Sequence, residues 1–418
     1  MRVLYASDRR RLDRLFTRDA ARLPHVERIA ARIVRDVRRE GDDAVVRWAR
    51  RLDALNGPIE LTRAEVDAGW RATPTDVRRA IRLAAAHIER VATRQVPPEF
   101  SVAVCPGVRV MQKTQAFARV GCYVPGGRYP LPSTLLMTVV PARVAGVPET
   151  IVVCPRPAPA VLAAAVEAGA TRVLRIGGAQ AVAALAYGTR SIAAVDKIVG
   201  PGNAWVAAAK TLVSAHCAID FHAGPSEIVI LAASGRPDWI AADLVAQAEH
   251  DPAVRPMLVT TSSGLAERVA AAVMSMLPPS GPARGAIRRH GAIVVARSDA
   301  EAVAIVNRIA PEHLVCERGA DVARFRTAGT IFVGRWSAQA AGDYCTGSNH
   351  VLPTGGAGRF RGGLSAADFI RVFTVQTITR EGLRRIGPAA MTLAQAEGLT
   401  AHAASLRTRL RSIVRTGT

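Results

Sequence analysis

Between residues 23 and 96, apolar residues recur every three or four positions, which is the spacing of amphipathic helices. Gly41 marks the end of the first predicted helix, and Thr73 precedes the start of a later one. The predicted apolar stripes are Val26, Ile29, Ile33 and Val37 in the first helix, and Ala80, Ile81, Ala84 and Ile88 in the later one. These segments carry no obvious chemistry, so the pattern predicts a helical scaffold.

From about residue 118 the pattern changes to short apolar runs that alternate with helical segments. The predicted strands are 118–124, 150–154, 172–176, 227–231, 257–260, 292–296 and 330–333. The predicted helices between them are 160–168, 179–187, 238–249, 264–276 and 302–309. Strands that alternate with helices at this spacing indicate an α/β fold with parallel sheets. From about residue 366 the pattern becomes helical again.

The length of 418 residues suggests two or three domains, and an apolar content of 49% is enough for a large core. No uncharged apolar window reaches the roughly 18 residues of a membrane span. The N-terminus lacks the apolar core of a secretory signal, and the six cysteines form no C-x-x-C pair. These features predict a cytoplasmic enzyme with reduced thiols and no membrane partner.

The formal net charge of +21 raises the question of nucleic-acid binding. The basic residues are spread along the chain, and aromatic residues for base stacking make up only 5% of it. We therefore expect no nucleic-acid partner, although a basic nucleic-acid-binding protein remains the rival of another class.

Three glycine-rich turns are candidates for a nucleotide site, at 125–127 after Tyr123, at 177–178, and at 200–203. The second turn lies between a predicted strand and a predicted helix, where backbone amides favour a phosphate. No G-x-G-x-x-G follows any strand, and each turn alone is also typical of ordinary structure. The spacing of these turns is therefore compatible with a nucleotide-binding crevice at the strand ends. It does not establish that NAD binds there.

Polar residues in three other places are candidates for metal binding and proton transfer. Gln247 and His250 are three positions apart on a predicted helix and would share a face. Asp343 and His402 could add a carboxylate and an imidazole, which zinc accepts. The adjacent pair of Glu312 and His313 could divide two proton transfers, since histidine titrates near neutral pH. Each of these residues alone is more typical of a solvated polar residue than of a functional one.

Taken together, ten segments in order along nearly the whole chain resemble the histidinol dehydrogenase family. They are VGCYVPGG (120–127), PSTLLM (132–137), IGGAQA (176–181), KIVGPGN (197–203), AGPSE (223–227), QAEH (247–250), PEHL (311–314), GDY (342–344), NHVLP (349–353) and EGLTAH (397–402). Ten ordered matches make chance similarity implausible.

The resemblance implies a set of roles for individual residues. It implies zinc ligands at Gln247, His250, Asp343 and His402, with one zinc per subunit. It implies that His313 is the base, that Glu312 activates water, and that NAD contacts Tyr123, Gln180 and Asn203. It implies substrate contacts at Ser226, Gln247, His250, His313, Asp343, Glu397 and His402.

The resemblance also implies an intertwined homodimer of two incomplete Rossmann-like domains, in which Glu397 and His402 come from the partner subunit. Residues 21–122 with 227–365 would form the first α/β domain, and 123–226 the NAD-binding domain. Residues 1–20 would be an N-terminal helical extension, and 366–418 a C-terminal helical extension that serves dimerisation and the active site.

The implied reaction is the last step of histidine synthesis, in which L-histidinol, two NAD and water give L-histidine through a bound aldehyde. A paralogue that oxidises another polar alcohol, such as a sulfonated diol, is the alternative. Glu397 favours histidinol, because it matches the position expected to contact the cationic end of the substrate.

Overall fold

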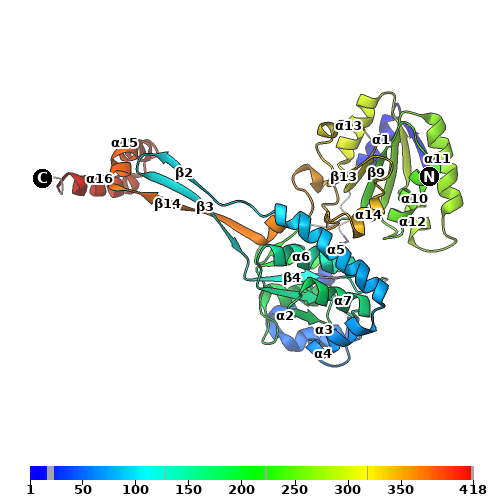
Figure 1. Cartoon of the computed structure of the whole chain (residues 1–418), viewed down its shortest axis with the longest axis horizontal. Helices are drawn as coiled ribbons and strands as arrows, with labels where there is room; N and C mark the ends of the chain where they lie inside the picture. The colour runs from blue at the N-terminus through cyan, green and yellow to red at the C-terminus, as the bar shows by residue number, and fades with distance from the viewer. Residues whose placement is uncertain (17–22, 128, 222–223, 318, 416–418) are drawn as a thin grey trace. The chain divides into compact units, whose positions relative to one another are not determined.

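The computed structural model describes residues 1–16, 23–127, 129–221, 224–317 and 319–415. The chain divides into two compact units, which are described separately here (Figure 1). The first unit comprises Met1–Gln95 and Phe117–Phe369, and the second comprises Val96–Ala116 and Ile370–Thr418. The first unit contains two parallel sheets, so the predicted α/β fold with parallel sheets is confirmed.

A six-stranded sheet in the first unit has the order β1-β11-β10-β9-β12-β13. Its strands are β1 (Arg2–Tyr5), β11 (Ala292–Val295), β10 (Arg255–Thr260), β9 (Glu227–Leu231), β12 (His313–Cys316) and β13 (Thr330–Val333). Consecutive strands β9, β10 and β11 extend to one side, whereas β12 lies on the other side of β9. The strand order therefore reverses between β9 and β12.

Alternate residues of this sheet face two separate apolar cores. Ile228 and Leu258 belong to one core, and Val229 and Met257 belong to the other. The first core is completed by α10 (Pro237–Ala248), α11 (Ser263–Met276) and α12 (Pro282–Arg289), and the second by α1 (Arg9–Phe16) and α13 (Asp299–Ile309). Coverage of both faces explains why these strands read as continuous apolar runs in the sequence.

A five-stranded parallel sheet has the order β6-β5-β4-β7-β8. Its strands are β4 (Arg119–Tyr123), β5 (Glu149–Val153), β6 (Arg172–Leu174), β7 (Lys197–Val199) and β8 (Ala218–Ile219). One large core joins this sheet to α2 (Pro24–Glu40), α3 (Asp42–Leu52), α8 (Gly178–Tyr187) and α9 (Ala204–Val213). A further group of helices packs together, with α6 against β4 and β5: α4 (Arg63–Ala72), α5 (Thr75–Arg94), α6 (Pro132–Val144) and α7 (Pro159–Ala168). Here the order reverses between β4 and β7.

The second unit combines a three-stranded antiparallel sheet with two helices (Figure 1). The strands are β2 (Phe100–Cys105), β3 (Val108–Ala116) and β14 (Ile370–Ile378), and the helices are α15 (Arg380–Ala396) and α16 (Thr400–Arg415). Many of its apolar side chains are exposed: Phe100, Val102, Val104, Val372, Val375, Ile378, Leu393 and Leu399.

Several predicted elements need correction. The predicted N-terminal helical extension, 1–20, begins with β1, which pairs in parallel with β11. The predicted helical region 366–418 contains α15 and α16 but also β14, whose nine residues pair with β3. Both strands pair with partners more than 250 residues away in the sequence, so local spacing does not reveal them. Ala80, assigned to an apolar stripe, is exposed, and α5 buries Ala85 and Ala92 instead.

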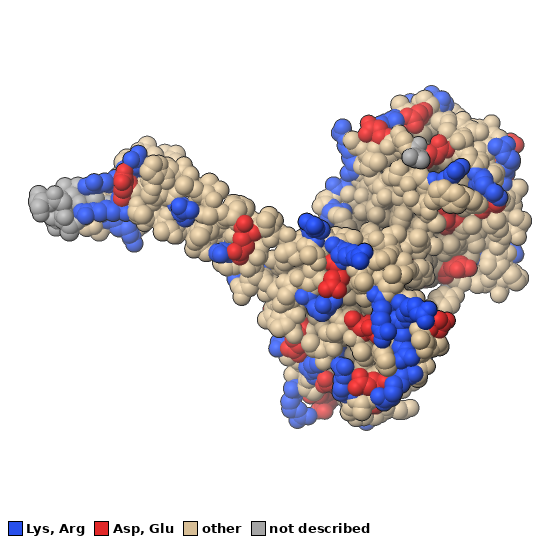
Figure 2. Space-filling model, in the orientation of Figure 1, with Lys and Arg blue, Asp and Glu red and all other residues tan. Residues whose placement is uncertain are grey.

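The basic residues do not gather into one continuous patch on the face in view. Figure 2 shows Lys and Arg side chains interspersed with acidic ones on that face. No helix in the described part of the chain has the length and apolar character that crossing a bilayer requires.

Candidate active site

The Glu312–His313 pair lies at the amino end of β12, next to the start of β9. Ser298 caps the start of α13 with a side chain that accepts a hydrogen bond from Glu301 N, and Ala310 is the C-cap of the helix. Ala310 adopts a left-handed conformation with φ 48°, which turns the chain through Pro311 into the strand. His313 then pairs with Ile228 of β9 in register. The strand pairing therefore fixes both side chains of the pair against the beginning of β9.

Main-chain groups of Glu227 hold both members of this pair. Glu227 N donates to Glu312 Oε2 at 2.9 Å, and His313 Nδ1 lies 3.3 Å from Glu227 O. Since a carbonyl oxygen only accepts, this contact places the ring proton on Nδ1 and leaves Nε2 able to accept a proton. His313 Nε2 lies 3.8 Å from Asp343 Oδ1.

The two side chains are buried, with exposed fractions of 5% for Glu312 and 3% for His313. Burial lowers the pKa of His313 to about 4, against the opposing effect of Asp343, so its neutral form predominates near pH 7. Burial also raises the pKa of Glu312 well above its usual value, and the Glu227 N–H and Ser226 hydroxyl oppose part of this increase. The pair thus combines a neutral imidazole with an unusually basic carboxylate.

Two of the predicted zinc ligands, Asp343 and His250, lie near His313. Gln247 is in the last turn of α10 and is 1% exposed. Asp343 is in α14 (Gln339–Tyr344), where its Oδ2 accepts from Gln339 Nε2 at 2.7 Å. His250 is exposed and lies two residues beyond the end of α10, in a turn where its N–H donates to Gln247 O at 3.3 Å. His250 is nonetheless close enough for its charge to lower the pKa of His313.

The residues in this region fit a metal in their chemistry. Gln247 Oε1 is buried and has no hydrogen-bond partner among the described residues. An amide oxygen left in this state gains from a cation beside it. Among the described residues, no group of three or more His, Cys, Asp or Glu side chains has an arrangement that could hold a metal ion. The zinc site therefore remains a prediction.

The predicted cofactor residues surround the point where the order of the five-stranded sheet reverses. Tyr123 ends β4, Gln180 lies in the first turn of α8, and Asn203 follows β7. Gly200, with φ 108°, approaches so closely that a Cβ would collide with Tyr123 O, so the turns after β4 and β7 are in contact. Ligands of parallel α/β sheets bind at such a position, outside the carboxyl ends of the strands.

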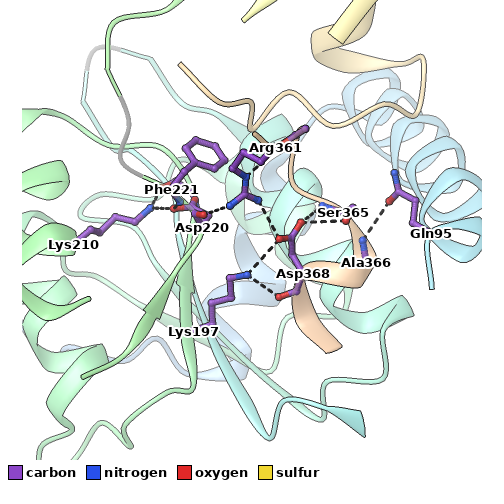
Figure 3. A network of polar contacts seen from close by, with 11 residues as sticks. Gln95, Lys197, Lys210, Asp220, Phe221, Arg361, Ser365, Ala366 and Asp368 are labelled. Carbon is purple, nitrogen blue, oxygen red and sulfur yellow. Dashed lines mark hydrogen bonds and ion pairs between the residues drawn. The ribbon is translucent and has the colours of Figure 1, made fainter. Parts of the chain in front are cut away.

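A buried charge network supports the turn at Gly200 (Figure 3). Asp220 Oδ2 accepts from Gly200 N at 2.8 Å, and Lys210 Nζ donates to Gly200 O at 3.0 Å while it pairs with Asp220 Oδ1. Arg361 donates to Asp220 O and, at 3.0 Å, to Asp368 Oδ1. Both main-chain polar groups of Gly200 are therefore fixed by one ion pair.

Known proteins similar to this chain agree on one family. A family model described as Histidinol dehydrogenase matches residues 16–410. The histidinol dehydrogenase of Methanothermobacter thermautotrophicus is 45% identical over 418 residues, with 97% of this chain and 98% of that protein covered. The enzyme of Rhodospirillum rubrum is 46% identical over 400 residues, with 92% of each chain covered.

The chain belongs to the histidinol dehydrogenase family.

A solved histidinol dehydrogenase has the same fold. The crystal structure of the enzyme from Elizabethkingia anophelis superimposes with a TM-score of 0.94 at 31% identity, covering 99% of this chain and 98% of that one. Members of the family are oxidoreductases, so the predicted enzyme class is confirmed. The alternative of a paralogue for another polar alcohol gains no support from these relatives, which are all named for histidinol.

The remaining predicted residues of the histidinol dehydrogenase site lie in different places. Ser226 immediately precedes β9 and is near Glu312. Glu397 is the C-cap of α15, and His402 is in α16, so both belong to the second unit, where they are exposed. Asn203 has a structural role in addition to any cofactor contact, because its Oδ1 accepts from Val206 N at 3.1 Å and caps α9.

Sequence reasoning did not assign His350, which contacts the Asp343 segment of this histidinol dehydrogenase site. His350 Nδ1 lies 2.8 Å from Asp343 O, and its Nε2 lies 3.2 Å from Thr134 Oγ1. Its position inside the NHVLP motif was a signal for it, but spacing alone connects it neither to Asp343 nor to Thr134.

Asp53 was also not assigned, and it lies beside the candidate cofactor residues. Asp53 Oδ2 accepts from Gly177 N and from Gln180 Nε2, each at 2.9 Å. Tyr123 OH accepts from Gly178 N at 2.9 Å. Nothing in the sequence distinguishes Asp53 from a solvated residue at the end of a helix.

Proposed function

We propose that this chain oxidises L-histidinol to L-histidine in two steps, with two NAD and one water consumed. The observation that supports this most strongly is the buried Glu312–His313 pair, held by Glu227 next to Asp343. It provides the two bases that an alcohol-to-acid oxidation needs, within a family of histidinol dehydrogenases.

The proposed zinc site consists of Gln247, His250 and Asp343 of one chain with His402 of a second copy. Amide oxygen, imidazole nitrogen and carboxylate oxygen are suitable donors for this metal, and the unpartnered Gln247 Oε1 supports the assignment. Zinc, when bound, supplies a fixed positive centre that orients the nitrogen atoms of the substrate.

In the first oxidation, His313 Nε2 accepts the proton of the substrate hydroxyl as a hydride leaves the carbinol carbon. The low pKa of His313 keeps Nε2 unprotonated and ready for this role. NAD, when bound near Tyr123, Gln180 and Asn203, supplies the hydride acceptor. The product of this step is the aldehyde, which stays in the site.

In the second oxidation, Glu312 accepts a proton from a water molecule whose oxygen adds to the aldehyde carbon. The raised pKa of Glu312 makes its carboxylate a stronger base than an ordinary glutamate. The proton that His313 took in the first oxidation passes to the aldehyde oxygen as water adds. The hydrate then carries a hydroxyl group and a hydrogen on one carbon, and the neutral His313 can repeat its role. The second hydride leaves to a second NAD, and the carboxylate of L-histidine results.

We also propose that the enzyme is a homodimer in which Glu397 and His402 of each chain complete the site of the other. The exposed apolar side chains of the second unit support this, because a unit with few buried residues is stabilised when a partner covers such surfaces. In this arrangement the two parallel sheets of the first unit correspond to incomplete Rossmann-like domains. The predicted domain borders remain predictions.

The test is NADH formation by the purified chain with L-histidinol and with a panel of other polar alcohols, sulfonated diols included. We expect turnover of L-histidinol and about one zinc per chain. Replacing His250 with Ala should lower the zinc content, whereas replacing the exposed His25, which lies in α2, should not. Turnover of another alcohol without any turnover of L-histidinol would contradict the proposal.

A further inference from the structure

Asp53 is a buried carboxylate that contacts the candidate cofactor residues from a different part of the chain. It follows the end of α3 and is 9% exposed. Its Oδ2 accepts hydrogen bonds from Gly177 N and Gln180 Nε2. The turn that begins α8 and the side chain of Gln180 are therefore both fixed by one oxygen of Asp53.

This contact determines the direction of the Gln180 amide. A carboxylate oxygen only accepts hydrogen bonds, so Gln180 must direct its NH₂ group, and not its oxygen, towards Asp53. The amide oxygen, Oε1, is left on the other side. It is buried and has no hydrogen-bond partner among the described residues.

The buried Gln180 Oε1 can accept a hydrogen bond from a ligand. Gln180 is 0% exposed, so Oε1 has already lost its contact with water. Its surroundings include the Gly178 backbone, since a Cβ built there would lie 2.7 Å from this oxygen. A ligand N–H or O–H that reaches Oε1 therefore gains a hydrogen bond with no further desolvation of the oxygen.

We propose that Asp53 is a positioning residue that makes the cofactor site present a hydrogen-bond acceptor, Gln180 Oε1, to an N–H or O–H donor of the dinucleotide. The carboxamide and the ribose hydroxyls of a nicotinamide dinucleotide are donors of this kind. This inference depends on the cofactor site proposed above. It adds the residue that determines whether Gln180 presents an acceptor or a donor to the cofactor.

The decisive variant is Asp53→Leu, which keeps the approximate size of the side chain and removes both carboxylate oxygens. Gly177 N and Gln180 Nε2 then lose the oxygen that accepts from both. The Gln180 amide is free to turn over, so its Oε1 is no longer held as the acceptor. We expect the Kd for NAD to rise about tenfold. The Kd for L-histidinol and the zinc content should stay within twofold.

Asp53→Asn tests whether the accepting oxygen, and not the charge, is what matters. Its amide oxygen can take the position of Asp53 Oδ2 and accept from both Gly177 N and Gln180 Nε2. NAD affinity should therefore stay within about threefold of the original value.

Asp42→Leu is a matched control on the same helix. Asp42 also accepts from a backbone amide and a side chain, Ser191 N at 3.1 Å and Ser191 Oγ at 2.8 Å, away from the candidate cofactor residues. Its loss should leave the Kd for NAD unchanged. A fall in NAD affinity as large as that of Asp53→Leu would mean that damage to α3, rather than the Gln180 amide, explains the result.

Gln180→Ala separates failure of this inference from failure of the proposed cofactor site. If Gln180→Ala leaves the Kd for NAD within twofold, the cofactor site itself is wrongly placed. If Gln180→Ala weakens NAD binding but Asp53→Leu does not, or if Asp53→Asn weakens it as much as Asp53→Leu does, the role of Asp53 is overturned while the cofactor site stands.

Discussion

The two parallel sheets of the first unit use opposite edges for their candidate chemistry. In the five-stranded sheet, Tyr123 and Asn203 lie at the carboxyl ends of β4 and β7, where the strand order reverses. In the six-stranded sheet, the order also reverses, between β9 and β12, yet Glu312 and His313 lie at the amino end of β12. The proposed sites thus follow the usual rule for parallel sheets in one sheet and not in the other.

The two sheet edges differ in the main-chain groups that they present. At the carboxyl edge of the five-stranded sheet, glycine turns and the start of α8 bring backbone N–H groups together. At the amino edge of the six-stranded sheet, the first residue of β9 supplies both an N–H and a carbonyl to the Glu312–His313 pair. Glu227 binds Glu312 with the first and His313 with the second. The start of a strand therefore orients the proposed acid–base pair.

The largest expected effect is loss of the base at the amino edge. His313→Asn should lower kcat with L-histidinol by about 10³-fold, because proton removal loses its acceptor. The Kd for NAD should stay within twofold, since the cofactor residues are on the other sheet. Steady-state kinetics and NAD titration measure the two quantities. A loss of NAD affinity equal to the loss of kcat would show that the two edges do not act separately.

Metal removal should come next and should also affect only the amino edge. Chelation should lower activity by at least about 100-fold, and added zinc should restore it, because the substrate loses the centre that orients it. Gln247→Ala should weaken zinc retention, measured by metal analysis after dialysis. The nearby Gln339→Ala, which removes the amide on Asp343, should retain more zinc than Gln247→Ala. Full zinc retention by Gln247→Ala would remove Gln247 from the ligand set.

At the carboxyl edge, Lys210→Met should mainly lower stability. It leaves Asp220 buried without its cation, and breaking such a buried pair costs about 3–5 kcal/mol. Chemical denaturation measures this change. Lys113→Met is the control, because its pair with Glu99 is exposed and should contribute far less. Equal losses in the two variants would mean that the Gly200 turn does not depend on the ion pair.

The smallest expected effect concerns Asn203, which combines a cap with a predicted cofactor contact. Asn203→Ala should cost about 1 kcal/mol of stability through loss of the α9 cap, whereas Asn203→Asp should keep the cap. If the amide NH₂ contacts NAD, both variants should raise the KM for NAD. An unchanged KM in both would leave Asn203 with its capping role alone.

Sequence reasoning found the parts of the fold that local pattern determines. The strand predicted at 227–231 has the observed bounds of β9. A short apolar run rich in β-branched residues between polar turns is typical of a buried strand. The pairing of β14 with β3 was missed, because Ile370 and Ala116 meet only in the folded chain. Spacing likewise cannot show that Asp53 reaches Gln180.

Part of the candidate site could also be predicted from the sequence. The resemblance pointed to Glu312 and His313, and the structure brings both against Glu227 next to Asp343. It could not reveal that His313 is buried, and burial is what lowers its pKa. His350 and Asp53 act through contacts with distant segments, which only the folded structure contains.

Amide hydrogen exchange with each ligand added alone tests most directly whether the two sheet edges hold different ligands. NAD should slow exchange at 177–182 and 199–206, whereas L-histidinol with zinc should slow exchange at 226–228 and 311–315. If NAD leaves the first two segments unprotected, or L-histidinol protects them in place of the second two, the assignment of cofactor and chemistry to opposite edges is contradicted.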